Sequence, residues 1–298
     1  MSVSAYRFID PHILAAISNL PLLARTVVDG FMLGAHQSPR PGAGQEFNQY
    51  RSYQPGDDLR RVDWKTYARS DRFYVRESEI ETSVTVRFIL DASASMAHRD
   101  RGLVKLDYAR FLIAALGYLA HQQGDAIGLY SLPENGAVAL PPKRDHQQLH
   151  RFLHQLEKLE PAGVWPEWQQ VENIFASAPM RELVIVVSDL HERREEITAA
   201  LTKLRALKHE VLLFQLLGRN EVDFTFAGEV TFQDLETGEK LPVNTEAARA
   251  SYRQTVQQHL GALARKWRQQ DVGYELLVLD QPLDHALRRY LTQRTKLH

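Results

Sequence analysis

The sequence predicts an α/β protein in which a mostly parallel sheet is covered by helices on both faces. Short apolar strands alternate with helical segments of about ten or more residues, which is typical of successive βαβ units. The strand segments, such as Leu183–Val187 and Val211–Leu217, are apolar throughout, as expected for strands buried on both faces. The chain has 298 residues, 44% of them hydrophobic, which is enough to bury a substantial core.

The first residues are predicted to be helical. Asp10 and Pro11 are typical of a helix N-cap followed by proline in the first turn. Pro21 is expected to start a second helix, and Gly30 to end it. The apolar stripe predicted for this second helix consists of Leu22, Leu23, Val27 and Val28.

The next segment combines loop composition with many aromatic residues. Gly34–Gly56 is rich in Gly, Pro, Gln and Arg, which predicts a loop. Arg51–Arg76 interleaves basic and aromatic residues, a mixture that can bind nucleic acid by phosphate contacts and stacking. Acidic residues offset most of this charge, so we interpret the segment as structural, with Arg–carboxylate pairs.

The rest of the chain alternates between strands and helices. We expect strands at Val84–Leu90, Asp125–Tyr130, Ala137–Leu140, Leu183–Val187, Val211–Leu217 and Tyr274–Leu279. We expect helices at Leu103–Leu119, around Leu149–Leu156, and at Glu167–Phe175, Ile197–Leu207, Thr245–Gln269 and Leu283–Leu291. The short link from Ser131 to Gly136 allows an antiparallel hairpin at one sheet edge.

Two smaller features complete the predicted organisation. Residues 223–244 interrupt the alternation, and the turn Glu236-Thr237-Gly238-Glu239 within them predicts a hairpin insertion. A strand expected at Phe73–Val75 could pair with this hairpin in a small satellite sheet. We therefore divide the chain into an N-terminal helical and loop segment, 1–80, and an α/β domain, 81–298.

Composition excludes several classes of function. The formal net charge is −1, so bulk charge favours neither a nucleic-acid nor a membrane partner. There is no cysteine, which excludes disulfides, thiolate catalysis and cysteine-based zinc sites. The apolar stretches fall far below the roughly 18 residues of a membrane span, and no targeting pattern is visible. We expect a cytoplasmic protein, and the sequence leaves its oligomeric state open.

Two predicted strands end in acidic, hydroxyl-bearing loops. The first strand leads into Asp91-Ala92-Ser93-Ala94-Ser95, and the strand at Leu183–Val187 leads into Ser188-Asp189. Ligands of open α/β sheets bind at the carboxyl ends of strands. Alternate residues of an extended loop point the same way, so Asp91, Ser93 and Ser95 could converge on one divalent cation, with Asp189 reaching it from the other strand. Alternatively, Ser93 and Ser95 only cap the following helix, and Asp91 bonds backbone amides.

Beyond this spacing, the sequence resembles a known family. The segment Val86-Arg87-Phe88-Ile89-Leu90 followed by Asp91-Ala92-Ser93-Ala94-Ser95-Met96 looks like the metal-ion-dependent adhesion site of von Willebrand factor A domains. Upstream, the stretch from Tyr53 to Arg69, with its Gln54-Pro55-Gly56-Asp57-Asp58 core, resembles the bacterial domain-of-unknown-function-58 family. The predicted hairpin at Phe232–Gly238 and Tyr252 also look like that family. The resemblance extends roughly from Gly34 to the C-terminus.

The resemblance implies a von Willebrand factor A-like, Rossmann-like fold with strand order 3-2-1-4-5-6. It implies Mg²⁺ or Mn²⁺ held by Asp91, Ser93 and Ser95, with Asp189 acting through water. The full adhesion site takes a threonine from a further loop, and the corresponding loop here, Pro161–Glu167, contains no hydroxyl side chain. Either water or Glu167 fills that place, or the affinity of the site for a metal ion is reduced.

Two functions remain open at this point. The family resembles non-enzymatic accessory proteins that work beside MoxR-type AAA+ ATPases in the assembly or activation of other proteins. The implied partner is therefore such an ATPase or its client. The alternative is a magnesium-dependent hydrolase acting on phosphate esters, with Asp91 or a metal-bound water as the reactive group. No phosphate-cradling glycine loop accompanies it in the sequence.

Overall fold

The computed structural model describes residues 11–15, 19–36, 50–52, 67, 69, 73–76, 83–131, 138–169, 172, 181–192 and 194–294. The chain divides into two compact units, Met1–Gly34 together with Val84–His298, and Ala35–Ser83. The first helices thus share a unit with the sheet, whereas the sequence grouped them with residues up to 80. None of the described helices is both long and apolar enough to cross a membrane.

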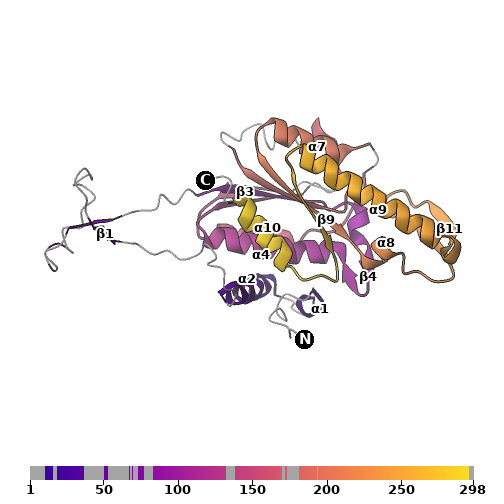
Figure 1. Ribbon diagram of the computed structural model, residues 1–298, viewed down its shortest axis with the longest axis horizontal. Helices are drawn as coiled ribbons and strands as arrows, with labels where there is room; N and C mark the ends of the chain where they lie inside the picture. Colours follow the sequence, from indigo (N-terminus) through magenta and orange to yellow (C-terminus); the bar gives the residue numbers. More distant parts are fainter. Residues whose placement is uncertain are drawn as a thin grey trace. The chain divides into compact units, whose positions relative to one another are not determined.

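The larger unit is built on a six-stranded sheet (Figure 1). Its strands in spatial order are β12 (Gly273–Val278), β9 (Glu210–Leu217), β8 (Leu183–Ser188), β3 (Thr85–Leu90), β6 (Ala126–Ser131) and β7 (Val138–Lys143). All neighbours are parallel except β6 and β7, which form the antiparallel edge. Numbered along the chain and read from β7 to β12, the six strands have the order 3-2-1-4-5-6, so the predicted topology is confirmed.

Helices cover both faces of this sheet. One face packs against α2 (Leu20–His36), α4 (Lys105–Gln122), α5 (Gln148–Glu157) and α10 (Asp284–Arg294). The other packs against α7 (Glu196–Ala206) and the end of α9 (Thr245–Gln269). Because side chains alternate along a strand, Ile185 belongs to the first core, and Val184 and Val186 belong to the second. The prediction that the strands are apolar because both faces are buried is therefore confirmed.

The N-terminal helices differ in detail from the prediction. A short α1 (Pro11–Leu14) precedes α2, and Asn19 begins α2 by accepting a hydrogen bond from the Leu22 amide at 2.8 Å. Gly30 does not end the helix, which continues to His36. Leu22 was placed in the apolar stripe, but its side chain is 56% exposed, whereas Leu23, Val27 and Val28 are fully buried.

The satellite pairing predicted from the sequence was wrong. β2 (Tyr74–Arg76) pairs antiparallel with β1 (Tyr50–Ser52), inside the segment expected to be a loop. The hairpin of β10 (Glu229–Gln233) and β11 (Lys240–Asn244) forms a separate two-stranded sheet, as its own turn chemistry dictates. Most of the helix expected at Glu167–Phe175 and most of the Arg51–Arg76 segment lie outside the described residues.

Besides β1, four short elements were not predicted, and these four follow the ends of central strands. They are η3 (Ala94–Ala97) with β4 (Arg99–Asp100) and β5 (Leu103–Val104) between β3 and α4, and α8 (Arg219–Asp223) after β9. Each has only two to five residues, too few for a hydrophobic period to be recognised. They matter because they bring side chains to the edge of the sheet where the strands end.

Candidate functional site

The candidate site begins where β3 and β8 end side by side. Leu90 lies opposite Val187 in the parallel register, and the Asp91 amide donates to the Val187 carbonyl at 2.9 Å. This last ladder bond fixes Asp91 beside Ser188, one residue before Asp189. All four predicted site residues are buried, with exposed fractions of 1% for Asp91, 2% for Ser93, 8% for Ser95 and 5% for Asp189.

Hydrogen bonds join these four residues into one cluster. The hydroxyls of Ser93 and Ser95 are 3.0 Å apart, and the Ser95 hydroxyl donates to Oδ1 of Asp189 at 3.1 Å. Oδ1 of Asp91 accepts from the Ser93 amide at 2.9 Å, which turns the loop back over the strand end. Oδ2 of Asp91 accepts from the Ser188 hydroxyl at 2.5 Å. The spacing that predicted convergence therefore brings together oxygen atoms from both strand ends.

The serines do not cap the following helix. Ser93 is the residue before η3, and its side chain makes no capping hydrogen bond. The long helix α4 begins only at Lys105, after the β4–β5 turn. The hydroxyls of Ser93 and Ser95 contact each other and Asp189 instead, so their positions are not explained by a helix cap.

The hydroxyl-free loop Pro161–Glu167 lies against this cluster, as expected. The Ala94 amide donates to the Gly163 carbonyl at 2.9 Å, and the Ala162 amide donates to the Ala92 carbonyl at 2.8 Å. The loop is therefore joined to the cluster by backbone hydrogen bonds, and its Trp165 is buried in the second core. Glu167 is exposed and lines a groove of about 280 Å³, together with Trp165 and His191 among others.

An ammonium group that was not predicted completes the site. Lys105, the first residue of α4, is buried, and its Nζ lies 2.8 Å from Oδ2 of Asp189 and 2.8 Å from Oε1 of Glu221 on α8. Lys105 and Asp189 also form part of the wall of a cavity of about 190 Å³, which Tyr252 and His259 of α9 line from the other side. Asp189 thus has a cationic partner within the protein.

The two aspartates differ in their electrostatic surroundings. Burial raises the pKa of Asp91 to about 6, and the nearby charge of Asp189 contributes in the same direction. Burial alone would also raise the pKa of Asp189, but Lys105 outweighs it and lowers that pKa below its ordinary value. Burial alone would lower the pKa of Lys105, but Asp189 and Glu221 outweigh burial and raise it.

The donor set fits a small divalent cation. Two oxygens bound side by side to Mg²⁺ at about 2.1 Å lie about 3.0 Å apart in an octahedral shell, and the Ser93 and Ser95 hydroxyls have this separation. The ammonium of Lys105 contacts the carboxylates of Asp189 and Glu221, and the carboxylate of Asp91 is bound by the Ser93 amide and the Ser188 hydroxyl instead. Asp91 has no ion pair within the described part of the chain, so a cation there would neutralise a buried charge.

The cation site would depend on hydroxyl oxygens and water. In the described part of the chain, no three or more His, Cys, Asp or Glu side chains are grouped so that they could hold a metal ion. Asp91, Ser93 and Ser95 would be the direct ligands, and Mg²⁺ readily keeps water at its remaining positions. The missing hydroxyl of the Pro161–Glu167 loop is compatible with this arrangement.

Sequence reasoning missed three polar residues of the site. Ser188 was noticed only as the neighbour of Asp189, although its hydroxyl binds Asp91. Lys105 lies near the start of the helix predicted at Leu103–Leu119, and a single basic residue there was the only available signal. Glu221 lies on the short helix α8, 116 positions from Lys105. No local pattern reports so distant a contact.

Comparisons with known proteins identify the family of this chain. The family model described as "Protein of unknown function DUF58" matches residues 49–261. Uncharacterized proteins of Mycobacterium tuberculosis and Mycobacterium bovis are 30% identical over 236 residues, which cover 77% of this chain and 73% of theirs.

Solved structures with a similar arrangement include a conserved hypothetical protein, BatB, from Bacteroides thetaiotaomicron. It is 14% identical with a TM-score of 0.46, and the match covers 72% of this chain and all of that one. The von Willebrand factor A domain titled SpRpn10 is 9% identical with a TM-score of 0.40, covering 70% of this chain and 95% of that one. The fold assignment rests on the sheet order itself, and the family on the sequence match. The chain belongs to the DUF58 family of proteins of unknown function.

Proposed function

We propose that this protein is a non-enzymatic interaction module that binds a partner protein through a cation held by Asp91, Ser93 and Ser95. One observation carries the proposal. A buried carboxylate without an ion pair in the described residues lies beside two hydroxyls at the carboxyl edge of a parallel sheet. Burying such a charge costs stability unless it is paired, so its presence points to a role in binding.

Mg²⁺ or Mn²⁺ bound there would offer an open coordination position that a carboxylate of the partner completes. Lys105 keeps Asp189 ionised and fixed, so Asp189 can orient water at the ion rather than bind it directly. Beside the site, the groove containing Trp165 offers apolar contact, with Val164 at its rim 39% exposed. These features are suited to docking a partner rather than to turning over a substrate.

The partner that we propose is a MoxR-type AAA+ ATPase or its client, in the assembly or activation of other proteins. This part of the proposal is supported by the family resemblance of the Tyr53–Arg69 segment and of the loop containing Asp91. The names of the related proteins add no partner, because these relatives are uncharacterized.

The cation is tested first, by thermal unfolding of the full chain with and without Mg²⁺ or Mn²⁺. At an ion concentration of about 100 times Kd, a ligand of the folded state adds about 2.7 kcal/mol of stability. We expect this gain for the wild type and none for the double variant Ser93→Ala and Ser95→Ala. Ser251→Ala, an exposed serine on α9, serves as the matched control and should behave as the wild type. An equal gain in the double variant would place the ion elsewhere and refute the site.

The partner is tested by measuring binding of a purified MoxR-type ATPase from the same organism to immobilised protein. We expect binding that EDTA abolishes, that the double serine variant loses and that Ser251→Ala retains. Binding that is indifferent to EDTA would contradict the cation-dependent mechanism, and absence of binding would contradict the partner. Hydrolysis of phosphate esters that requires Asp91 would overturn the non-enzymatic assignment in favour of a hydrolase.

A further inference from the structure

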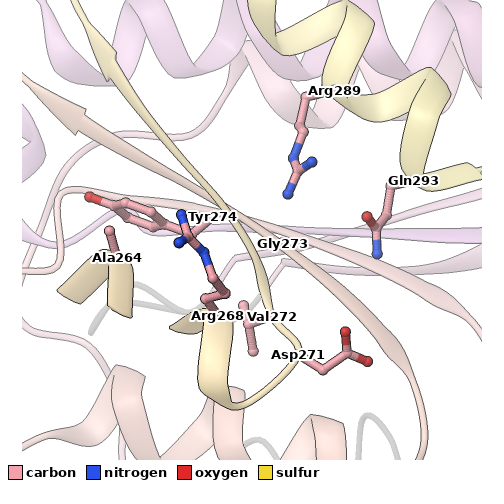
Figure 2. Close-up of a pocket in the computed structure, with 8 residues that line it drawn as sticks. All are labelled: Ala264, Arg268, Asp271, Val272, Gly273, Tyr274, Arg289 and Gln293. Atoms are coloured by element: carbon pink, nitrogen blue, oxygen red, sulfur yellow. The ribbon is translucent and has the colours of Figure 1, made fainter. Parts of the chain in front are cut away.

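A second polar cavity lies at the amino end of β12, whereas the candidate site lies at the carboxyl ends of β3 and β8. It encloses about 220 Å³ around the first residues of β12, the edge strand, between the end of α9 and the last turns of α10. Figure 2 shows Arg268 reaching it from α9, and Arg289 and Gln293 from α10. This volume is below the roughly 300 Å³ at which pockets for drug-sized ligands begin. The cavity therefore suits a small molecule or ion.

The charge of this cavity is positive. Neither Arg268 nor Arg289 has an ion pair in the described part of the chain. The carboxylate in the lining, Asp271, is bound by Arg205 of α7, and the Tyr274 hydroxyl donates to Gln215 at 2.7 Å. Two guanidinium groups therefore face the cavity without a matching anion, which is the arrangement that recognises oxyanions.

Two buried polar atoms at the cavity also have no partner. Nε of Arg289 is a buried donor without an acceptor, and Oε1 of Gln293 is a buried acceptor without a donor. The Gln293 side chain, in a residue only 3% exposed, is oriented by its amide nitrogen, which donates to Glu210 at 2.9 Å. Exchanging the two amide atoms would place oxygen against that carboxylate, so the acceptor must remain where it is.

We propose that this cavity binds inorganic hydrogen phosphate. The guanidinium groups of Arg268 and Arg289 would hold the charged oxygens, and the P–O–H group would donate to Oε1 of Gln293. Near neutral pH both forms of inorganic phosphate keep a hydroxyl, whereas sulfate has none. A phosphate monoester has lost its own hydroxyl proton well above its second pKa of about 6. The site therefore selects free phosphate over both.

The proposal is tested by isothermal titration of the full chain with sodium phosphate at pH 7.5 and constant ionic strength. We expect saturable binding that Arg289→Gln and Arg268→Gln each weaken about tenfold or more, because each removes a charge-assisted hydrogen bond. Arg265→Gln is the matched control, since Arg265 is exposed on the same helix as Arg268 and does not line the cavity. It should bind phosphate as the wild type does.

The competing outcomes are distinct. Sulfate and glycerol phosphate are titrated in parallel, and we expect both to bind more weakly than phosphate. Equal binding of sulfate would refute the role of Gln293, and equal weakening by Arg265→Gln would reduce the effect to general surface charge. Absence of saturable binding would mean that the cavity holds only water. Arg268 is exposed, so Arg268→Gln leaves the core unchanged and gives a valid result even if Arg289→Gln is poorly folded.

Discussion

At the scale of single residues, the buried charge of Asp91 lowers the stability of the fold. Its carboxylate is buried, receives hydrogen bonds from Ser93 and Ser188, and lies near the charge of Asp189. Lys105 neutralises the charge of Asp189, but it makes no contact with Asp91 and leaves the charge of Asp91 unpaired. A residue kept in such surroundings trades stability for function, so removing its charge should make the cation-free protein more stable.

The variant Asp91→Asn tests whether the charge of Asp91 lowers the stability of the cation-free protein. Asn keeps an oxygen for the Ser93 amide, and its nitrogen can donate to the Ser188 hydroxyl, so the local geometry is retained. Because the pKa of Asp91 is raised to about 6, the folded wild type loses stability as pH rises from about 4 to above 6. Without divalent cations, the stability advantage of Asp91→Asn should grow over that window to about 1–3 kcal/mol. Urea unfolding at pH 4, 5, 6 and 7 measures it.

The same variant separates charge from cation binding. Adding Mg²⁺ at pH 7 should stabilise the wild type and leave Asp91→Asn unchanged, so that the difference between them shrinks. An Asn variant that is less stable than the wild type at pH 7 without cations would show that the Asp91 charge is already compensated. That result would remove the reason for expecting a cation.

Residues in the candidate site could be predicted only where the chain is locally regular. Asp91, Ser93 and Ser95 follow one strand and Asp189 follows another, so strand alternation alone placed them at one edge. Lys105 and Glu221 could not be placed, because their contacts with each other and with Asp189 join segments 84 and 116 positions apart. Such contacts are set by the packing of α4 and α8 and leave no periodic trace in the sequence.

At the scale of elements, α4 and α5 approach each other closely at Gly117 of α4. A Cβ placed on Gly117 would lie 2.6 Å from Cε1 of Phe152 on α5, and Phe152 is itself fully buried and cannot move aside. The Phe152 ring also packs edge-on against Phe88 of β3, with ring centroids 5.3 Å apart. Gly117 therefore sets the distance from α4 to α5 and, through Phe152, to the sheet.

We predict that Gly117→Ala destabilises the protein by about 1–3 kcal/mol, as overpacking of a core does. Helix propensity alone predicts the opposite sign, a gain of about 1 kcal/mol. The matched control is Gly261→Ala on α9, where the nearest atom to the new methyl is a terminal nitrogen of Arg265 at 3.5 Å. That variant should gain stability. Midpoints of chemical unfolding for the two variants measure both signs, and a gain in both would show that α4 and α5 are free to move apart.

The sequence predicted elements correctly where the hydrophobic period extends over many residues. Predictions failed for helix ends and for very short strands. The range of α9 was predicted as Thr245–Gln269, and Asn244 begins it by accepting from the Ala247 amide. Gly30 was expected to end α2, but a single glycine is tolerated within a helix whose other residues pack on the core. The β1–β2 pairing was missed because three-residue strands carry no alternation.

At the scale of the whole molecule, α2 near the start of the chain and α10, the last described helix, pack on the same core. Residues of α2, α4 and α10 contribute to one hydrophobic cluster, and the guanidinium of Arg288 on α10 lies 5.5 Å from the ring centre of Phe31 on α2. The candidate cation site and the cavity proposed for phosphate lie at opposite ends of the strands. Binding at either could thus alter the other only through the sheet and the helices α9 and α10.

Asp125 connects the start of the sheet to the last helix. Its buried carboxylate accepts from the Val84 amide at 2.9 Å, just before β3 begins. The same carboxylate receives two hydrogen bonds from Arg294 at the end of α10, at 2.7 and 2.9 Å, and this pairing raises the pKa of Arg294. One side chain thus joins the start of β3 to the end of α10, where Arg294 lies 169 positions after Asp125.

We predict that Asp125→Ala lowers the free energy of unfolding by about 3–5 kcal/mol, because it leaves Arg294 and the Val84 amide without their buried partner. Asp145→Ala is the control, since Asp145 pairs with Arg151 on the surface and its loss should have little effect. Because Asp125 joins the central sheet to the last helix, the loss should appear as one earlier transition in fluorescence, circular dichroism and hydrogen exchange alike. If hydrogen exchange instead accelerates only in α10 while the global unfolding midpoint is unchanged, then α10 unfolds independently of the sheet. In that case Asp125 does not hold the two together.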